Sequence, residues 1–402
     1  MDAVIHKKKE SIRKLFPKWV KLKEEYQEIT IFQETGWLES WWEYKSKIET
    51  ITPYIIEIRE HNKTIGIIPL YCSQEKFKNI NFRILKPIGD ELSDYLIPIL
   101  SIKYPTDKQL GIAWKKIKKD RDSWDFIEWG DIPENSVLDS FFKRQSKWKN
   151  PLISRIRGHV CPFLELNNNA ETVKLKFEQN LLNEILKKER KLEKKGDLLF
   201  SKVLAEKEIE PVMNMLFEFH CERWANTKSP SRFSNLEDRQ HALDAARSLF
   251  KCNLLHLTYL SFNNEIISVE FAMKDDKKIY LYNTGYSNKY KKYSVGNIML
   301  YKLIIDACKE GFDILDFTRG GENYKKQWGT LQKYNVKYTF FNFSLKSVFY
   351  KILYQVYKSK LLKLYINKFF EMKLLKSKLR ILIITLLNVQ QFFELDELLM
   401  IL

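Results

Sequence analysis

The sequence has few cysteines, and they stand far apart from one another. None belongs to a CxxC pair or to a cluster with metal-ligand spacing; they are Cys72, Cys161, Cys221, Cys252 and Cys308. This distribution argues against a disulfide framework and against a zinc site. We therefore expect a protein of the reducing cytoplasm that binds no metal.

Long apolar runs are also missing. No stretch reaches the roughly 18 apolar residues that a helix needs to cross a bilayer. The first residues, MDAVIHKKKESIRKLF, are charged and lack the apolar core of a signal peptide. We expect a protein that is soluble or peripherally bound to a membrane.

Acidic residues are too few to balance the basic ones. The chain has 68 Lys+Arg against 51 Asp+Glu, a net charge of +17. This excess favours a polyanionic ligand, an anionic membrane surface or a nucleic acid as partner, without choosing among them. A length of 402 residues, 45% of them hydrophobic, suffices for two packed cores.

Hydrophobic periodicity predicts the order of helices and strands in the first half. A helix is expected over 18–45, with a stripe of core aromatics that comprises Trp37, Trp41, Trp42 and Tyr44. The other expected elements are a β-hairpin over 54–72, a strand over 82–88, a helix over 107–119 and a strand that begins at 124.

The second half has a similar order of patterns. Helices are expected over 170–195, 208–225 and 242–251, followed by a hairpin over 254–273, a strand over 278–286, a helix over 298–309, and strands from 312 and over 336–344. The charges of the 170–195 helix suit a solvated face, or alternatively a stripe that binds nucleic acid.

Two segments align with each other. WDFIEWG at 124–130 matches FDILDFT at 312–318 in pattern, and each follows a hairpin, a third strand and a helix. We infer an internal duplication. The first copy has no equivalent of the Arg319–Glu322 segment, so its site is expected to be vestigial or only to bind. The expected domains are residues 1–164 and 165–345, followed by a tail over 346–402.

The stretch FDILDFTRGGENYKKQWG at 312–329 is the strongest candidate for a functional site. Asp316 and Arg319 are expected at the carboxyl end of a buried strand, where ligands bind in α/β sheets. A short helix can then present further polar and aromatic side chains toward the same cleft; these are Glu322, Tyr324, Lys325 and Trp328. The alternative is a polar strand-to-helix turn with an internal Asp–Arg pair.

A basic loop between the strand over 278–286 and the next helix is a candidate phosphate site. Its candidate binding residues are Lys289, Lys291, Lys292, Ser294, Gly296 and Asn297. A loop that leads into a helix offers unpaired N–H groups and the positive end of the helix dipole, so a pyrophosphate can bind there. The alternative is an ordinary basic loop with Ser294 as the helix N-cap. If the strands on either side diverge, an extended ligand can pair with the free strand edge.

Together these features resemble the GNAT acyltransferase superfamily, in particular its CelD/BcsL-like branch, which is related in architecture to the Fem-type peptidyl transferases. The branch has a D-x-x-R-G-x-E-x-Y-K-x-x-W pattern, matched by Asp316, Arg319, Gly320, Glu322, Tyr324, Lys325 and Trp328. The resemblance covers roughly residues 20 to 345. The phosphate loop departs from the family's glycine-rich pattern and reads YSVGN at 293–297.

The resemblance implies an α/β fold of tandem GNAT-like domains, each a mixed, mostly antiparallel sheet flanked by helices, with the second domain catalytic. It also implies transfer of an acyl group from acyl-CoA to an amine or hydroxyl by direct attack. This chemistry needs a base, donors for the oxyanion and an acid for the leaving thiolate.

The residues offer candidates for each of these roles. Asp316 is expected to be the base or to orient the substrate, and Glu270, an acid on an apolar strand, can have a raised pKa suited to a base. Tyr324 is the candidate acid, and Arg319 is expected to hold an anionic acceptor or to brace Glu322. Glu322, Lys325 and Trp328 complete the predicted substrate site. His220 and His256 can act as bases, or can be structural.

The tail from 346 to 380 mixes basic residues with aromatic residues and leucines. It is expected to form amphipathic helices that lie on an anionic membrane, or that pack on the catalytic body or on a second protomer. The leading hypothesis is an acyl-CoA-dependent transferase acting on a cell-envelope sugar or lipid-linked precursor. The alternatives are Fem-like transfer from aminoacyl-tRNA, which a basic protein suits, and a non-catalytic GNAT-like scaffold.

Overall fold

The computed structural model describes residues 1–26, 29–77, 80–146, 152–167, 169–225, 230–342, 344 and 346–347. The chain divides into a compact unit, Met1–Phe340, and a second unit, Phe341–Leu402. Apart from residues 346 and 347, the predicted amphipathic tail lies outside the described residues. Among the helices of the described part, none is long and apolar enough to cross a bilayer.

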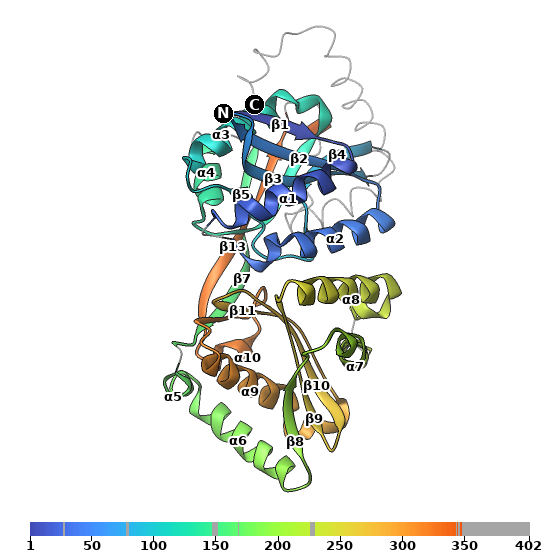
Figure 1. The fold of residues 1–402 in the computed structure, drawn as a ribbon, viewed down its shortest axis with the longest axis vertical. Coiled ribbons are helices and arrows are strands. Elements are labelled where there is room, and N and C mark those ends of the chain that lie inside the picture. The colour runs from blue at the N-terminus through green and yellow to red at the C-terminus, as the bar shows by residue number, and fades with distance from the viewer. Residues whose placement is uncertain are drawn as a thin grey trace, which may run out of the picture. The chain divides into compact units, whose positions relative to one another are not determined.

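The compact unit is built on one long sheet (Figure 1). Its strands are β1 (Asp2–His6), β2 (Ile51–Glu60), β3 (Lys63–Phe77), β4 (Ile80–Pro87), β5 (Ile99–Leu100), β6 (Phe126–Pro133), β7 (Ile153–Glu165), β8 (Leu198–Lys202), β9 (Leu255–Phe262), β10 (Glu265–Lys274), β11 (Lys278–Tyr286), β12 (Ile314–Asp316) and β13 (Leu331–Phe341). Their order across the sheet is β1-β2-β3-β4-β6-β13-β7-β12-β11-β10-β9-β8, with β5 paired to β3.

Helices cover both faces of the sheet (Figure 1). They are α1 (Glu10–Lys23), α2 (Thr35–Ile48), α3 (Thr106–Lys119), α4 (Val137–Gln145), α5 (Ala170–Lys174), α6 (Gln179–Glu193), α7 (Glu206–Trp224), α8 (Leu236–Lys251), α9 (Val295–Lys309) and α10 (Asn323–Lys326), with short 3₁₀ turns η1 (Ile31–Gln33), η2 (Arg121–Ser123), η3 (Arg232–Ser234) and η4 (Asn288–Tyr293). The predicted fold class, an α/β fold with a mostly antiparallel sheet flanked by helices, is confirmed.

The buried side chains form three cores. One spans both halves of the sheet beneath α1, α2, α7 and α8. A second lies under α3 and α4 in the first half, and a third lies under α5, α6 and α9 in the second half. Three residues of the predicted aromatic stripe, Trp37, Trp41 and Trp42, lie in the first core, whereas Tyr44 is only half-buried and lies outside it.

Both predicted hairpins are present, and local chemistry explains their turns. β2 and β3 are joined by His61 and Asn62, and β9 and β10 by Asn263 and Asn264. All four residues have positive φ. Two consecutive residues with positive φ form the turn that matches the twist of a two-residue hairpin, and asparagine tolerates this conformation well.

The two halves share one order of elements. A hairpin, a third strand, a helix and a fourth strand follow one another as β2-β3-β4-α3-β6 and again as β9-β10-β11-α9-β12. In both halves the fourth strand pairs in parallel with the third, β6 with β4 and β12 with β11. The topology therefore repeats, as the aligned segments predict. The division at residues 164 and 165 stays a prediction.

The last strand of each half lies in the other half. β7 follows β6 in the chain but pairs with β12, whereas β13 follows β12 and lies next to β6. β7 and β13 also pair with each other over most of their length. The exchange makes the two halves parts of one continuous sheet, and sequence analysis missed it along with β7 itself.

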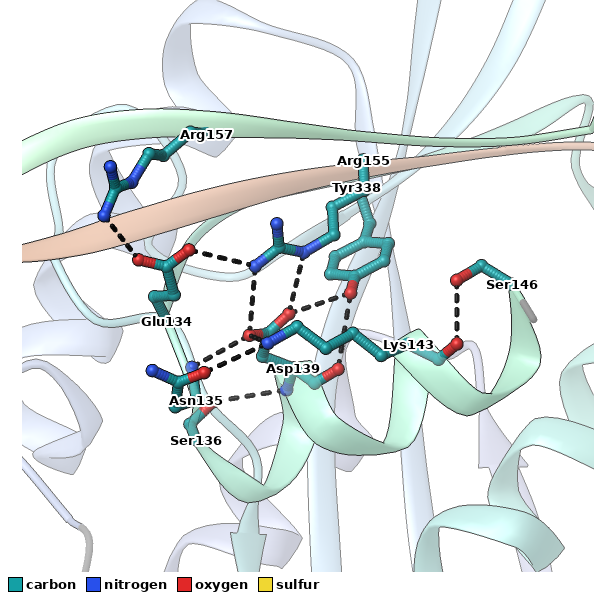
Figure 2. A network of polar contacts seen from close by, with 9 residues as sticks. All are labelled: Glu134, Asn135, Ser136, Asp139, Lys143, Ser146, Arg155, Arg157 and Tyr338. Carbon is teal, nitrogen blue, oxygen red and sulfur yellow. Dashed lines mark hydrogen bonds and ion pairs between the residues drawn. The ribbon is translucent and has the colours of Figure 1, made fainter. Parts of the chain in front are cut away.

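A buried carboxylate fixes the exchanged strands in the first half (Figure 2). Asp139 of α4 accepts hydrogen bonds from Tyr338 of β13 (2.8 Å) and from Arg155 of β7 (3.1 and 3.2 Å). Lys143 lies 2.8 Å from the same carboxylate. Burial by itself raises the pKa of Asp139, but the donors from Arg155 and Lys143 outweigh it and lower the pKa to about 2.

Asp139→Asn should destabilise the protein by roughly 2–4 kcal/mol at pH 7, because two cations then lose a fully buried partner. A carboxyl with a lowered folded pKa contributes stability above its unfolded pKa and loses it as the pH falls toward about 2. Urea denaturation at pH 7, 4 and 3 should therefore show a steeper acid loss for wild type than for the variant. The exposed Asp122→Asn is the control, and equal pH dependence in wild type and Asp139→Asn would contradict the role.

Two of the predicted helices are wrong in extent, because a local cap divides one and tertiary contacts divide the other. The helix expected over 18–45 is two helices, α1 and α2, separated by a segment in which Thr30 and Gln33 form a reciprocal cap. The helix expected over 170–195 is α5 and α6. Between them the N–H of Glu178 donates to the carbonyl of Gln327. The carbonyl of Lys176 occupies the space that a Cβ at Gly329 would need.

Candidate active site

The strands β11 and β12 pair for only a short distance. Their register runs from Lys278 opposite Ile314 to Tyr280 opposite Asp316 and then ends. β11 continues for six residues, to Tyr286. Beyond the pairing, Thr318 has a positive φ and its hydroxyl donates to the carbonyl of Leu281 at 2.8 Å. The two strands therefore diverge beyond Leu281. This is the condition given above for an extended ligand to pair with the free edge of β11.

The predicted phosphate loop follows the divergent part of β11. It forms η4 and ends at Ser294, whose φ of 52° turns the chain into α9. The Ser294 side chain does not cap the helix and instead accepts a hydrogen bond from Lys188 of α6 at 3.0 Å. Gly296 lies against the Tyr286 ring, which a Cβ would approach to 3.0 Å. Asn297 lies in the first turn of α9, and its N–H donates to the carbonyl of Ser294 at 2.9 Å.

Lysines surround this loop, but they are not equivalent. Lys289 is ion-paired with Glu265 at 2.7 Å. Lys291 and Lys292 are exposed. The ammonium of Lys292 lies 5.3 Å from the centre of the Tyr293 ring, and that of Lys195, just after α6, lies 5.7 Å from it. A hydrogen bond from Lys195, with the charges of Lys195 and Lys292, lowers the pKa of Tyr293 against the effect of burial. The loop is therefore a strongly positive surface.

Glu270 lies beside the divergent part of β11. It is on β10, directly across from Thr284, and only 2% of it is exposed. The Thr284 hydroxyl donates to one carboxylate oxygen, while the other has no hydrogen-bond partner among the described residues. Burial raises the pKa of Glu270 to about 8, although Thr284 and the charge of Lys325 oppose the rise. This carboxyl can therefore gain or lose a proton near neutral pH.

Tyr324 is close enough to Glu270 to be affected by its charge. Burial is the main cause that raises the pKa of the Tyr324 phenol, followed by the charges of Glu270 and Glu322, and Arg223 lowers it. The side chain is nonetheless 44% exposed. Tyr324 therefore stays protonated near neutral pH and is accessible from solvent.

The other residues of α10 and its flanks hold the backbone of the turn after β12 in place. Lys325 is buried and donates to the carbonyls of Phe317, Arg319 and Gly320 at 3.1 to 3.2 Å. Glu322 pairs with it at 2.9 Å. Trp328 is fully buried, with its ring edge-on to Phe177. Lys325 and Trp328 thus brace the turn, and neither is available to a substrate in this structure.

Asp316 is fully buried at the junction of the two halves. It accepts hydrogen bonds from the Tyr95 hydroxyl (2.8 Å) and the Thr318 N–H (2.8 Å), and Lys333 of β13 lies 2.6 Å away. Lys333 also lies over the Tyr95 ring, 4.2 Å from its centre. These contacts favour a role in joining the two halves over the predicted role as a base.

Arg319 also binds the first half of the chain. Its guanidinium lies 2.6 Å from Asp94 and 3.5 Å from Asp131, and donates to the carbonyl of Ser93 at 2.6 Å. Burial raises the pKa of Asp94 to about 6, and Arg319 opposes that rise. Because two carboxylates already occupy Arg319, it is poorly placed to hold the anionic acceptor that the sequence analysis expected.

The structure thus divides the predicted site in two. Glu270 and Tyr324 belong with the phosphate loop, whereas Asp316 and Arg319 face the loop over 89–95. Sequence reasoning missed the partners Thr284, Tyr95 and Lys333. The polar segment GDELSDY at 89–95, which follows a strand as the second-half motif does, was the one signal for this loop.

The two candidate histidines differ in their surroundings. His220 contacts the Ser231 hydroxyl at 2.8 Å and stacks on Trp224, and burial lowers its pKa to about 4. His256 is buried on β9, and its Nε2 lies 3.8 Å from Glu310, the residue that follows α9. Glu310 is also ion-paired with Lys202. Neither lies with Glu270, so a structural role fits both better.

A comparison with known protein families finds a match to part of the chain. Residues 179–326 match the family described as Acetyltransferase (GNAT) domain. This segment contains Glu270, the phosphate loop and Tyr324. No curated protein matches the chain.

Solved structures share its fold at low sequence identity. FemX is 11% identical, with a TM-score of 0.58 over 88% of this chain and 99% of its own. A conserved protein of unknown function from Bacteroides thetaiotaomicron is 9% identical, with a TM-score of 0.54 over 81% of this chain and 97% of its own. The C-terminal domain of a putative lysylphosphatidylglycerol synthetase from Agrobacterium fabrum is 9% identical, with a TM-score of 0.51 over 82% of this chain and 92% of its own.

Proposed function

We propose that this chain, which matches a GNAT acetyltransferase domain over residues 179–326, is an acyl-CoA-dependent N- or O-acyltransferase. The observation that carries the proposal is the position of Glu270, a buried carboxyl with a pKa of about 8 beside the divergent strands. A base that titrates near the working pH is well matched to proton abstraction.

In the proposed reaction, acyl-CoA supplies an activated acyl group. The first turn of α9, with Lys291 and Lys292, binds the pyrophosphate, and the free edge of β11 pairs with the extended arm. Glu270 takes the proton of the acceptor amine or hydroxyl as that atom bonds to the acyl carbon and the C–S bond breaks. Tyr324 donates to the departing sulfur. Asp316 and Arg319 act as positioning residues that hold the two halves together.

The acceptor is proposed to be a cell-envelope sugar or lipid-linked precursor, as in the CelD/BcsL-like branch that the sequence resembles, with the protein in the cytoplasm or bound to the inner face of the membrane. Incubation with a panel of acyl-CoA thioesters, with and without envelope extract, tests the proposal through release of free thiol. Release that requires both donor and extract supports it. If no thioester is consumed under any condition, acyl-CoA is not the donor.

Lys291→Ala/Lys292→Ala should weaken CoA binding by about 5- to 20-fold, because each exposed lysine contributes a modest attraction to the pyrophosphate. Isothermal titration calorimetry with CoA measures the effect. Lys277→Ala/Lys309→Ala is the matched control, since these exposed lysines lie at the opposite ends of β11 and α9. Equal loss in both double variants would place CoA elsewhere.

A specific surface favours a second candidate, transfer from aminoacyl-tRNA. Basic residues of α6 and its C-terminal end line a hollow of about 350 Å³; they are Lys187, Arg190, Lys191 and Lys194. α6 adjoins the phosphate loop through Lys188 and Ser294. A large polyanionic donor could use both surfaces. tRNA binding that falls steeply with salt, together with no thioester turnover, would favour this donor over acyl-CoA.

A further inference from the structure

A hollow of about 340 Å³ lies between α2 and α8, apart from the Glu270 cluster. Its lining combines carboxylates with hydroxyl, amide and imidazole groups. These come from Gly36, Glu39, Ser40, Glu43, Tyr44 and Lys47 on α2 and from Glu237, Gln240, His241, Asp244 and Ser248 on α8. The volume is that of a small-molecule site.

The hollow is acidic although the chain has a net charge of +17. Four exposed carboxylates line it, against one lysine, Lys47; they belong to Glu39, Glu43, Glu237 and Asp244. Among the described residues, Glu39 and Glu237 have no cation within 4.0 Å, and the nearest arginine atoms lie 3.7 Å from Glu43 and 3.9 Å from Asp244. Two of the four carboxylates, those of Glu39 and Glu237, therefore lack an ion pair within the described part of the chain.

Close helix packing brings these carboxylates together. Gly36 permits the contact, since a Cβ there would lie 2.3 Å from the Ser248 hydroxyl. At the other end of the pair, Tyr44 donates to Asp238 at 2.9 Å, so the two helices run antiparallel. Carboxylates from both helices thus line one hollow, and their mutual repulsion favours a cation between them.

His241 forms part of the lining, and its ring is buried. It is 3% exposed, and neither ring nitrogen makes a hydrogen bond to any residue in the part of the chain that the structure describes. Burial lowers its pKa to about 3, so the ring is neutral near pH 7, with one donor and one acceptor. Its ring centre lies 4.8 Å from that of Tyr44. A buried polar group without a partner is rare and costly unless a ligand or water satisfies it.

We propose that this hollow binds a small organic polyamine. Ammonium groups match the carboxylates on both helices, an N–H donor matches the free nitrogen of His241, and an alkyl chain can lie against Tyr44. A metal ion fits less well. In the described part of the chain, the group with metal-ligand spacing is elsewhere, at His256, Asp306 and Glu310, and Lys202 is already ion-paired with its two carboxylates.

Such a ligand would bridge the two halves of the molecule, because α2 belongs to the first half and α8 to the second (Figure 1). The site does not contain Glu270, Tyr324 or the phosphate loop. The proposal therefore holds or fails independently of the acyl-transfer reaction.

Isothermal titration of the full chain with spermidine at physiological salt tests the proposal. We expect saturable binding at a single site, weakened about 5- to 30-fold in Glu39→Gln/Glu237→Gln, which removes two unpaired carboxylates. Glu10→Gln/Glu24→Gln, at the first residue of α1 and at its C-cap, makes the same change in net charge at exposed positions and should leave the affinity within twofold.

Three results would overturn the site. These are the absence of saturable spermidine binding, equal weakening in both double variants, and displacement of spermidine by Mg²⁺ as readily as by an added diamine at matched ionic strength. The last two would mean that the cation only joins the diffuse ion atmosphere of the protein. Since all four substituted residues are exposed, loss of folding is not expected to obscure the comparison.

Discussion

Replacing Glu270 with glutamine should lower the rate of acyl transfer by about 10²- to 10⁴-fold, the usual contribution of a positioned base. The wild-type rate should rise with pH and level off above about 8, because the carboxyl must lose its proton before it can accept one from the acceptor. Initial rates of thiol release between pH 6 and 9.5 measure both effects. Asp276→Asn, an exposed change in the turn that follows β10, is the control.

Glu270→Gln should be more stable than wild type at high pH, although it is less active. A carboxyl whose folded pKa is raised favours the folded state below its unfolded pKa, near 4.5, and loses that contribution as the pH rises through about 8. Glutamine does not titrate. Glu270→Gln should therefore match wild type near pH 4.5 and exceed it by roughly 2–4 kcal/mol at pH 9. If the variant kept wild-type activity, or lost both activity and stability, Glu270 would not be the base.

The Thr284→Val variant tests whether Thr284 acts on the rate through the pKa of Glu270. The Thr284 hydroxyl lowers the pKa of Glu270, so its loss should move the midpoint of the pH–rate profile upward while leaving the rate at high pH nearly intact. A purely structural role for Thr284 would instead reduce the rate equally at every pH.

Asp316→Asn should destabilise the protein by roughly 2–4 kcal/mol, because the amide brings N–H groups toward three existing donors and leaves Lys333 without its partner. Urea denaturation measures the loss. Asp313→Asn lies in the same segment but is exposed, and should have little effect. A double-mutant cycle with Lys333→Met should show coupling of about 1–3 kcal/mol between the two residues.

The same variant decides between the two roles of Asp316. A positioning residue should lower kcat by less than about tenfold at temperatures where the variant is folded, well below the effect of a lost base. If Asp316→Asn abolished transfer and left the stability unchanged, the sequence-based assignment of Asp316 as the base would be restored.

Local features of the fold were predictable from the sequence. The Asn263–Asn264 turn follows from the tolerance of asparagine for positive φ, and β11 was predicted with its observed bounds from its pattern. The loop after β11 and the following helix are present as expected, although α9 begins at Val295 and includes Gly296 and Asn297. These features depend on contacts within about ten residues, which a sequence displays directly.

The sequence by itself therefore determined the repeated order of hairpin, strand, helix and strand, and the position of Glu270 on an apolar strand. Only the tertiary structure decided that β7 and β13 change places, that Asp316 faces Tyr95 and Lys333, and that the Glu270 pKa rises to about 8. The reason is that strand partners, ion-pair partners and the cost of burying a charge are set by residues distant in the chain, and neither propensity nor periodicity contains that information.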